Sequence, residues 1–303
     1  MKRFFFCTAV FLTIFLAVSA QTSSSSILYA PLKGRAPFVQ VELTDRFPFQ
    51  DDAELLDVDF INVGIGDAIF AQSGGETMLI DGGTRRHSAA LVRFLEERDI
   101  RELTYILNTH AHDDHIEGIQ FLIMNGYRAG EVLSMHPRDD KNMQHTALMG
   151  LIEKAGIPFK QVHSGETMML GKAALTFIRD ERKDAGLSLN AMSMMLLIRY
   201  GNRSIFLPAD VSGESLTLAA QSFPDLLKTD IMKSPHHGIN RLREDFLGLL
   251  NLKLVVITNN RSGGEVLASQ LLRKGIPHIY TSTGTLHLQT DGEHWFVHQA
   301  PGK

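Results

Sequence analysis

The sequence predicts a layered α/β fold, with one catalytic domain over residues 55–303. Short apolar runs alternate with amphipathic segments through this region, and strands punctuated by helices are typical of sheets covered by helices. No internal period of repeat-protein length is visible, so a repeat architecture is excluded. Of the 303 residues, 44% are hydrophobic and 21% are charged, which is enough apolar material to bury a full core.

The first 20 residues have the pattern of a secretory signal peptide. Two basic residues precede an apolar run over residues 4–18, and small residues lead to a cleavage site after Ala20. A retained anchor is the weaker alternative, because the run is shorter than the ~20 residues that span a bilayer. Cys7 is the only cysteine, so the mature chain would hold a metal without sulfur. We expect a secreted or periplasmic protein with no stable membrane association after processing.

Residues 21–54 contain a serine run and scattered prolines without a helical or strand period, which predicts a linker or N-terminal extension. Beyond it, apolar runs predict strands over residues 56–63, 68–71, 77–81, 105–107, 168–178, 230–233, 253–258 and 278–281. Helical spacing predicts helices over residues 87–100, 116–127, 141–156, 214–223, 242–250 and 265–275. Two hairpins are expected, one joining residues 192–200 to 203–207 and one leading through Asp291 and Gly292 into residues 295–297.

The strongest chemical signal is the stretch LNTHAHDDHIEG at residues 107–118. It places His110, His112, Asp114 and His115 within six positions, directly after an apolar strand. A loop at a strand end can turn successive side chains toward one point, and imidazole nitrogens with a carboxylate oxygen suit divalent ions such as Zn²⁺. The alternative is a polar turn whose histidines cap the following helix, but lone histidines rarely cluster this densely. The stretch therefore predicts a metal site.

Three further stretches end an apolar run with a potential ligand. They are residues 78–83, with Asp81 before two glycines, residues 205–210, which end at Asp210, and residues 230–238, which contain His236 and His237. Each could be a surface loop when it is taken alone. Together they favour a binuclear site, because two ions need ligands from several strand ends.

These motifs resemble the metallo-β-lactamase superfamily, and more narrowly the metallo-β-lactamase-fold domain of ComEC-type competence DNA-uptake proteins. The resemblance rests on DVDFINVGIGDA at residues 57–68, LIDGG, the histidine-rich loop, NAMS at residues 190–193, HHG at residues 236–238 and Thr283-Gly284. It covers essentially the whole chain beyond the linker. It implies a four-layer αββα sandwich with two divalent metal ions at one edge, Zn²⁺ or alternatively Mn²⁺.

The same resemblance implies roles for individual residues. His110 and His112 would hold the first metal, Asp114, His115 and His237 would hold the second, and Asp210 would bridge the two. Asp81 would orient a ligand by hydrogen bonding from behind. His236 is the reserve candidate for His237, which directly precedes the glycine.

One departure concerns the first metal. The superfamily usually supplies another histidine to it before the bridging aspartate, where this chain offers Asn190. His163 is the nearest substitute, although its sequence context is that of an ordinary strand entry. The departure keeps open a secreted metal-binding protein without turnover.

The implied chemistry is hydrolysis without a covalent enzyme intermediate, with Asp114 and Asp210 as the residues that carry catalysis. Two divalent ions can lower the pKa of a bridging water to about 7 and stabilise charge on the attacked centre. The resemblance favours a phosphodiesterase or nuclease, with a nucleic acid strand as substrate. A net charge of -4 and the lack of a long Lys/Arg run argue against tight DNA binding. A hydrolase of a lactam, lactone or other small ester is the alternative enzyme.

Overall fold

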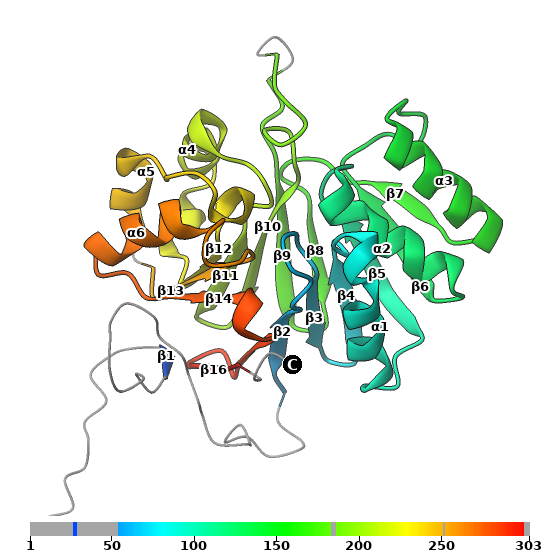
Figure 1. Ribbon diagram of the computed structural model, residues 1–303, viewed down its shortest axis with the longest axis horizontal. Coiled ribbons are helices and arrows are strands. Elements are labelled where there is room, and N and C mark those ends of the chain that lie inside the picture. The colour runs from blue at the N-terminus through cyan, green and yellow to red at the C-terminus, as the bar shows by residue number, and fades with distance from the viewer. Residues whose placement is uncertain (1–26, 29–53, 183–185, 251, 300–303) are drawn as a thin grey trace, which may run out of the picture.

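The computed structural model of the chain describes residues 27–28, 54–182, 186–250 and 252–299 (Figure 1). The signal peptide expected over residues 1–20 lies outside the described residues, as does most of the linker expected over residues 21–54. Inside that linker, Ile27–Leu28 forms a short strand, β1, which the sequence analysis did not expect. It pairs in parallel with β16 (Trp295–Gln299) at one edge of a sheet.

Two mixed sheets face each other at the centre of the molecule (Figure 1). The first has the order β1-β16-β15-β2-β3-β4-β5-β6-β7, with β15 Leu286–Thr290, β2 Leu56–Phe60, β3 Ile69–Ser73, β4 Glu76–Ile80, β5 Glu102–Asn108, β6 Arg128–Ser134 and β7 Phe159–Gln161. The second has the order β14-β13-β12-β11-β10-β9-β8, with β14 His278–Tyr280, β13 Leu254–Ile257, β12 Ile231–Lys233, β11 Arg203–Leu207, β10 Met195–Tyr200, β9 Ala173–Ile178 and β8 Thr167–Leu170.

Helices cover the outer face of each sheet. On the first sheet these are α1 (Ser88–Glu96), α2 (Asp113–Met124) and α3 (Met143–Ala155), and on the second α4 (Gly213–Ser222), α5 (Glu244–Leu249) and α6 (Glu265–Arg273). Apolar side chains, including the fully buried Trp295, Phe60 and Phe177, fill the space between the sheets. The predicted α/β fold, a four-layer αββα sandwich, is therefore confirmed. Among the described residues, no helix is long and apolar enough to cross a membrane.

Besides the unexpected β1, three details of the element prediction were wrong. The helix expected to begin at residue 116 begins at Asp113, so that Asp114 and His115 lie in its first turn. Two acidic residues there suit the positive end of the helix dipole. Strands β6 and β7 were not predicted, because β6 has only one Val-Leu pair among small and polar residues and β7 has only three residues.

The strand directions bring the predicted ligands to one edge. Strands β4 and β5 run parallel in the first sheet, and β11 and β12 run parallel in the second. Loops after their carboxyl ends carry the side chains with metal chemistry. A Cβ on Gly118 would lie 1.9 Å from the carbonyl oxygen of Gly82, so only glycine lets α2 pack this closely against the end of β4. This contact places Asp81 beside the first turn of α2.

Candidate metal centre

One group of possible ligands consists of His110, His112 and Asp210. The two histidines come from the loop between β5 and α2, and Asp210 follows β11 in the other sheet. His110 Nε2 lies 3.0 Å from His112 Nδ1 and 3.8 Å from Asp210 Oδ2. All three donor atoms fall within the reach of one ion. The predicted residues of the first metal are thus brought together.

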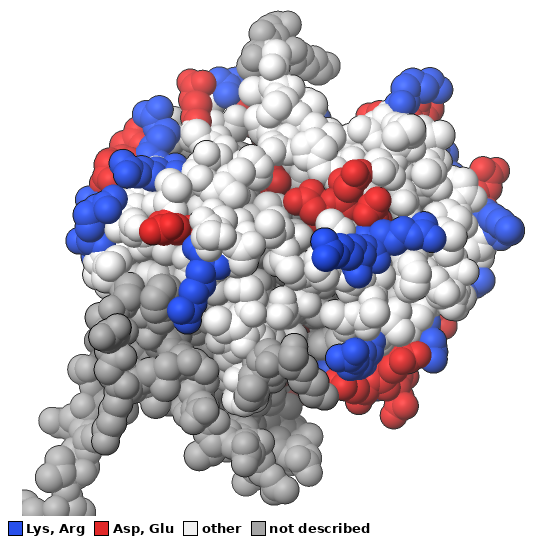
Figure 2. Space-filling model, in the orientation of Figure 1, with Lys and Arg blue, Asp and Glu red and all other residues white. Residues whose placement is uncertain are grey.

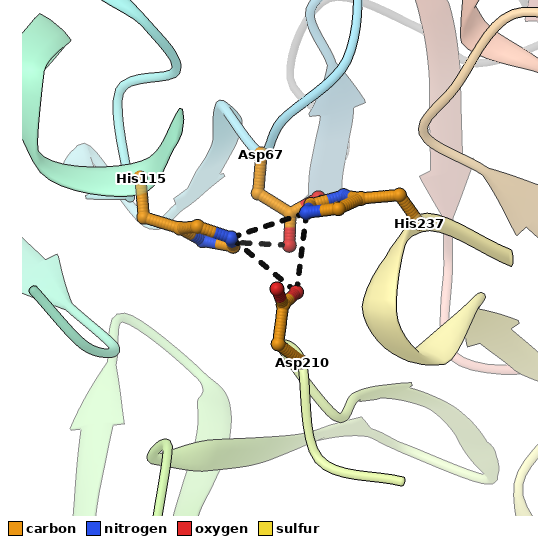
Figure 3. Close-up of side chains that lie close together, drawn as sticks. All are labelled: Asp67, His115, Asp210 and His237. Carbon is orange, nitrogen blue, oxygen red and sulfur yellow. Dashed lines mark hydrogen bonds and ion pairs between the residues drawn. The ribbon is translucent and has the colours of Figure 1, made fainter. Parts of the chain in front are cut away.

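A second group lies on the other side of Asp210 and contains His115 and His237 (Figure 3). His115 stands in the first turn of α2, and His237 belongs to the 3₁₀ helix η3 (Pro235–Gly238) that follows β12. His115 Nε2 is 3.2 Å from His237 Nε2, and the two nitrogens lie 3.3 and 3.2 Å from Asp210 Oδ1. Asp210 therefore turns one carboxylate oxygen to each group.

The spacing of the second group fits a zinc ion. Zinc–nitrogen bonds of about 2.0–2.1 Å in a tetrahedron place neighbouring donor atoms about 3.3 Å apart. The three distances among His115 Nε2, His237 Nε2 and Asp210 Oδ1 match this value. Asp210 Oδ1 is also buried without a hydrogen-bond partner, as expected of an atom that serves a cation. These residues fit the divalent metal that the donor set implies.

Two aspartates, Asp114 and Asp67, lie close enough to be the fourth ligand of this group. Asp114 Oδ2 lies 3.2 Å from His237 Nε2, on the same side of the imidazoles as Asp210. Asp67 comes from the loop between β2 and β3 and completes the buried group by distance (Figure 3). Its oxygens, however, approach His237 at Nδ1, at 3.3 Å, and His115 at Nδ1, at 3.9 Å. By this geometry Asp114 would face an ion bound between the two Nε2 atoms, whereas Asp67 lies behind the rings and supplies negative charge there.

Hydrogen bonds behind the imidazoles fix which nitrogen faces the centre. His115 Nδ1 donates to Asp81 Oδ2 at 2.7 Å, and Asp81 also accepts from the backbone amide and hydroxyl of Thr109, at 2.8 and 2.6 Å. His237 Nδ1 bonds Thr258 Oγ1 at 3.0 Å. Both rings therefore present Nε2 inward. Asp81 thus lies behind His115, in the position expected of a residue that would orient a metal ligand.

Several residues around the centre have an energetically unfavourable, left-handed backbone conformation. Five non-glycine residues of the described chain have positive φ, and four of them lie here: Asp81, Ala209, His236 and His237. Such conformations cost of order 1–3 kcal/mol each and cluster at functional sites. The surrounding fold therefore holds these side chains in place against a local preference for other geometries.

The sequence analysis missed two residues at this centre, Asp67 and Lys233. Lys233 ends β12 and is fully buried, with Nζ 2.6 Å from Asp67 Oδ2, 2.8 Å from the carbonyl oxygen of Ala209 and 3.5 Å from Asp210 Oδ1. Two signals could have found them. A lysine that ends an apolar run needs a buried partner. Gly64 and Gly66 directly before Asp67 indicate a tight loop, and in the structure a Cβ on Gly66 would meet the carbonyl oxygen of Asp114 at 2.5 Å.

The carboxylates also control the charge of the imidazoles. Burial lowers the pKa of His115, but Asp210 and Asp81 outweigh it and hold the pKa well above its usual value. Burial and the nearby Lys233 lower the pKa of His237, but Asp210 and Asp67 outweigh them and raise this pKa to about 10. A metal ion must displace these protons to reach Nε2. Metal affinity should therefore rise with pH.

His236 and Asn190 lie at the first group. His236 Nε2 is 3.2 Å from Asn190 Nδ2 and 3.7 Å from Asp210 Oδ2. His236 thus lies on the Oδ2 side of Asp210, whereas His237 lies on the Oδ1 side with His115, so the geometry favours His237 over His236 for the second group. His163, the substitute considered above, is exposed at the turn before β8, where its backbone amide bonds Glu166.

Replacing Asp81 with asparagine should weaken metal binding at the second group by about 10- to 100-fold, the usual effect of removing a carboxylate behind a histidine ligand. Zinc titration against a competing chelator measures this. Asp113→Asn is the matched control. Asp113 lies in the first turn of α2, as His115 does, but its side chain bonds Gln144 at the surface. Equal affinities for the two variants would contradict the role of Asp81.

Comparison with known proteins finds one matching family model and several similar proteins. Residues 61–168 match the family model described as the metallo-β-lactamase superfamily. ComE operon protein 3 of Bacillus subtilis (strain 168) is 26% identical over 231 residues, which cover 68% of this chain and 29% of that protein. The chain therefore spans less than a third of this relative. The metallo-β-lactamase fold protein YhfI from Bacillus subtilis superposes with a TM-score of 0.50 at 11% identity, covering 74% of this chain and 95% of YhfI. At this identity the likeness to YhfI is one of fold.

Proposed function

We propose that this chain, which resembles ComEC-type proteins of the metallo-β-lactamase superfamily, is an exported metal-dependent phosphodiesterase acting on nucleic acid strands. The observation that carries the proposal is Asp210, whose two oxygens face two separate groups of imidazoles. A carboxylate in this position can serve two ions at once. A phosphodiester benefits from two cations, because two non-bridging oxygens carry its charge.

Each residue has a defined task in this proposal. His110, His112, His115, His237, Asp114 and Asp210 would hold divalent ions, which when bound would supply Lewis acidity to neutralise the phosphate and to lower the pKa of water. Asp210 sets the relation of the two groups, and Asp114, whose side chain is 30% exposed, is the acidic ligand nearest the solvent. Asp81 and Thr258 hold the rings of His115 and His237 in one orientation. The chain thus presents a preorganised site to a substrate that approaches from solvent.

The distribution of charged side chains on the surface predicts weak binding to the nucleic acid backbone. Figure 2 shows acidic side chains gathered at the centre of the viewed face, above the region of α2, beside a short basic strip. No wide basic groove is visible on this face. Because few phosphate contacts can release counterions, affinity for a nucleic acid strand should be modest and should fall as salt rises.

A substrate panel tests the proposal. The purified protein should hydrolyse bis(p-nitrophenyl) phosphate and single-stranded DNA, lose this activity to a chelator and regain it with Zn²⁺ or Mn²⁺. His112→Ala and Asp114→Ala should abolish turnover while the protein stays soluble. Strong hydrolysis of a chromogenic cephalosporin or a lactone, with none of either phosphodiester, would instead establish the small-ester hydrolase. Metal binding without any turnover would establish a binding protein.

The proposed location has its own test. If residues 1–20 direct export and are removed, the exported protein should begin at or near Gln21. N-terminal sequencing or intact mass of protein recovered from the medium or periplasm measures this. Recovery of the full-length chain in the membrane fraction would contradict it.

A further inference from the structure

The first group of possible metal ligands offers one donor atom fewer than the second group. The second group offers two nitrogens, from His115 and His237, and a carboxylate oxygen on either side, from Asp114 and Asp210. The first offers His110, His112 and one oxygen of Asp210. Four-coordinate binding there needs one more donor atom, or a water in its place.

Asn190 presents an unused donor atom beside this group. Its amide nitrogen is 3.2 Å from His236 Nε2, while its oxygen, Oδ1, is buried and has no hydrogen-bond partner. Buried amide oxygens are nearly always paired, because leaving one unpaired costs about 1–3 kcal/mol. The lack of a hydrogen-bond partner for Asn190 Oδ1 is explained if this oxygen binds a metal ion held by the first group.

His236 is placed to hold that amide. Its Nε2 lies 3.2 Å from Asn190 Nδ2, and its Nδ1 lies 3.2 Å from Asn240 Nδ2. Nε2 accepts from Asn190 when the ring proton sits on Nδ1, and the exchange of oxygen and nitrogen in the Asn240 amide then lets Asn240 accept that proton. The side chain of His236 is 26% exposed, and its Nε2 lies 3.7 Å from Asp210 Oδ2. His236 has a left-handed backbone, with φ of 46°, and its ring contacts Asn190.

We propose that Asn190 Oδ1 is the fourth protein ligand of the first metal, after His110, His112 and Asp210, and that His236 is a positioning residue that orients the Asn190 amide. The proposal rests on the proposed metal-dependent function but makes no claim about the substrate. Two nitrogens and two oxygens then surround each ion. An amide oxygen is a harder and weaker ligand than imidazole, so the first site should bind its ion less tightly and accept Mn²⁺ more readily than a three-histidine site would.

Metal titration of the full chain tests this without any substrate. Binding of Zn²⁺ and of Mn²⁺ is followed by equilibrium dialysis with elemental analysis, and His112→Ala identifies which of the two binding steps belongs to the first group. Asn190→Ala and His236→Ala should each weaken that step by about 10- to 100-fold and leave the other step unchanged. The double variant should be no weaker than Asn190→Ala, because the histidine acts through the amide. His163→Ala, which removes an exposed imidazole outside the centre, is the control.

Asn190→His is expected to increase metal affinity, a result that misfolding of the variant could not produce. It should tighten Zn²⁺ at the first step, shift the preference of that step from Mn²⁺ toward Zn²⁺, and do so also in the His236→Ala background. The proposal is overturned if Asn190→Ala binds both ions as the parent does, or if His236→Ala alone abolishes the first step, which would make His236 the ligand. Failure of the phosphodiesterase assay would leave these titrations, and their outcome, intact.

Discussion

Replacing Asp210 with alanine should remove both metal ions and all hydrolytic activity. Among the described residues, Asp210 is the possible ligand that belongs to both groups, with Oδ2 near His110 and Oδ1 within 3.3 Å of His115 and His237. Its loss takes an anionic ligand from each ion. Removing a residue that merely supports a ligand already costs about 10- to 100-fold in affinity, so the loss of a shared ligand should exceed that at both steps.

Elemental analysis after dialysis measures the effect. His112→Ala serves as the comparison, since it should empty the first group and leave the second occupied. If Asp210→Ala retained both ions, or lost only one, Asp210 would not be shared between the groups.

Replacing Lys233 with methionine should destabilise the metal-free protein by about 3–5 kcal/mol, the usual cost of removing one partner from a buried ion pair. Lys233 is fully buried, and its loss leaves Asp67 without its nearest cation. The double variant Lys233→Met with Asp67→Asn should recover much of this stability, because no buried charge is then left unpaired.

Urea unfolding in the presence of chelator measures these differences. Arg243→Met is the matched control, because Arg243 pairs with Asp245 at the surface and an exposed pair contributes less than about 1 kcal/mol. A loss for Lys233→Met as small as that of the control would show that the buried pair does not stabilise the fold.

The fold and most of the metal centre could be predicted because their signals are local. Apolar periodicity located most strands and helices, and His110, His112, Asp114 and His115 are neighbours in one loop and the helix turn that follows it. Asp81 and Asp210 could be placed by a simple rule, since each follows an apolar run that becomes a strand. Parallel strands end at a common edge, so residues after their ends meet there.

The remaining features depend on packing that no local pattern encodes. Asp67 and Lys233 pair only because the β2–β3 loop and the end of β12 meet in the folded chain. His236 and His237 could not be told apart, because only the folded chain places their rings on different sides of Asp210. The start of α2 was placed too late because its acidic first turn, a helix signal, was interpreted only as a ligand run.

The most direct test of the account is anomalous diffraction from crystals of the protein loaded with Zn²⁺ or Mn²⁺. The account predicts two anomalous peaks about 3.5–4 Å apart, the usual separation in two-metal sites. One should lie between His110 and His112, the other between His115 and His237, with one oxygen of Asp210 toward each. A single peak, or a pair of peaks that Asp210 does not join, would contradict the shared binuclear centre.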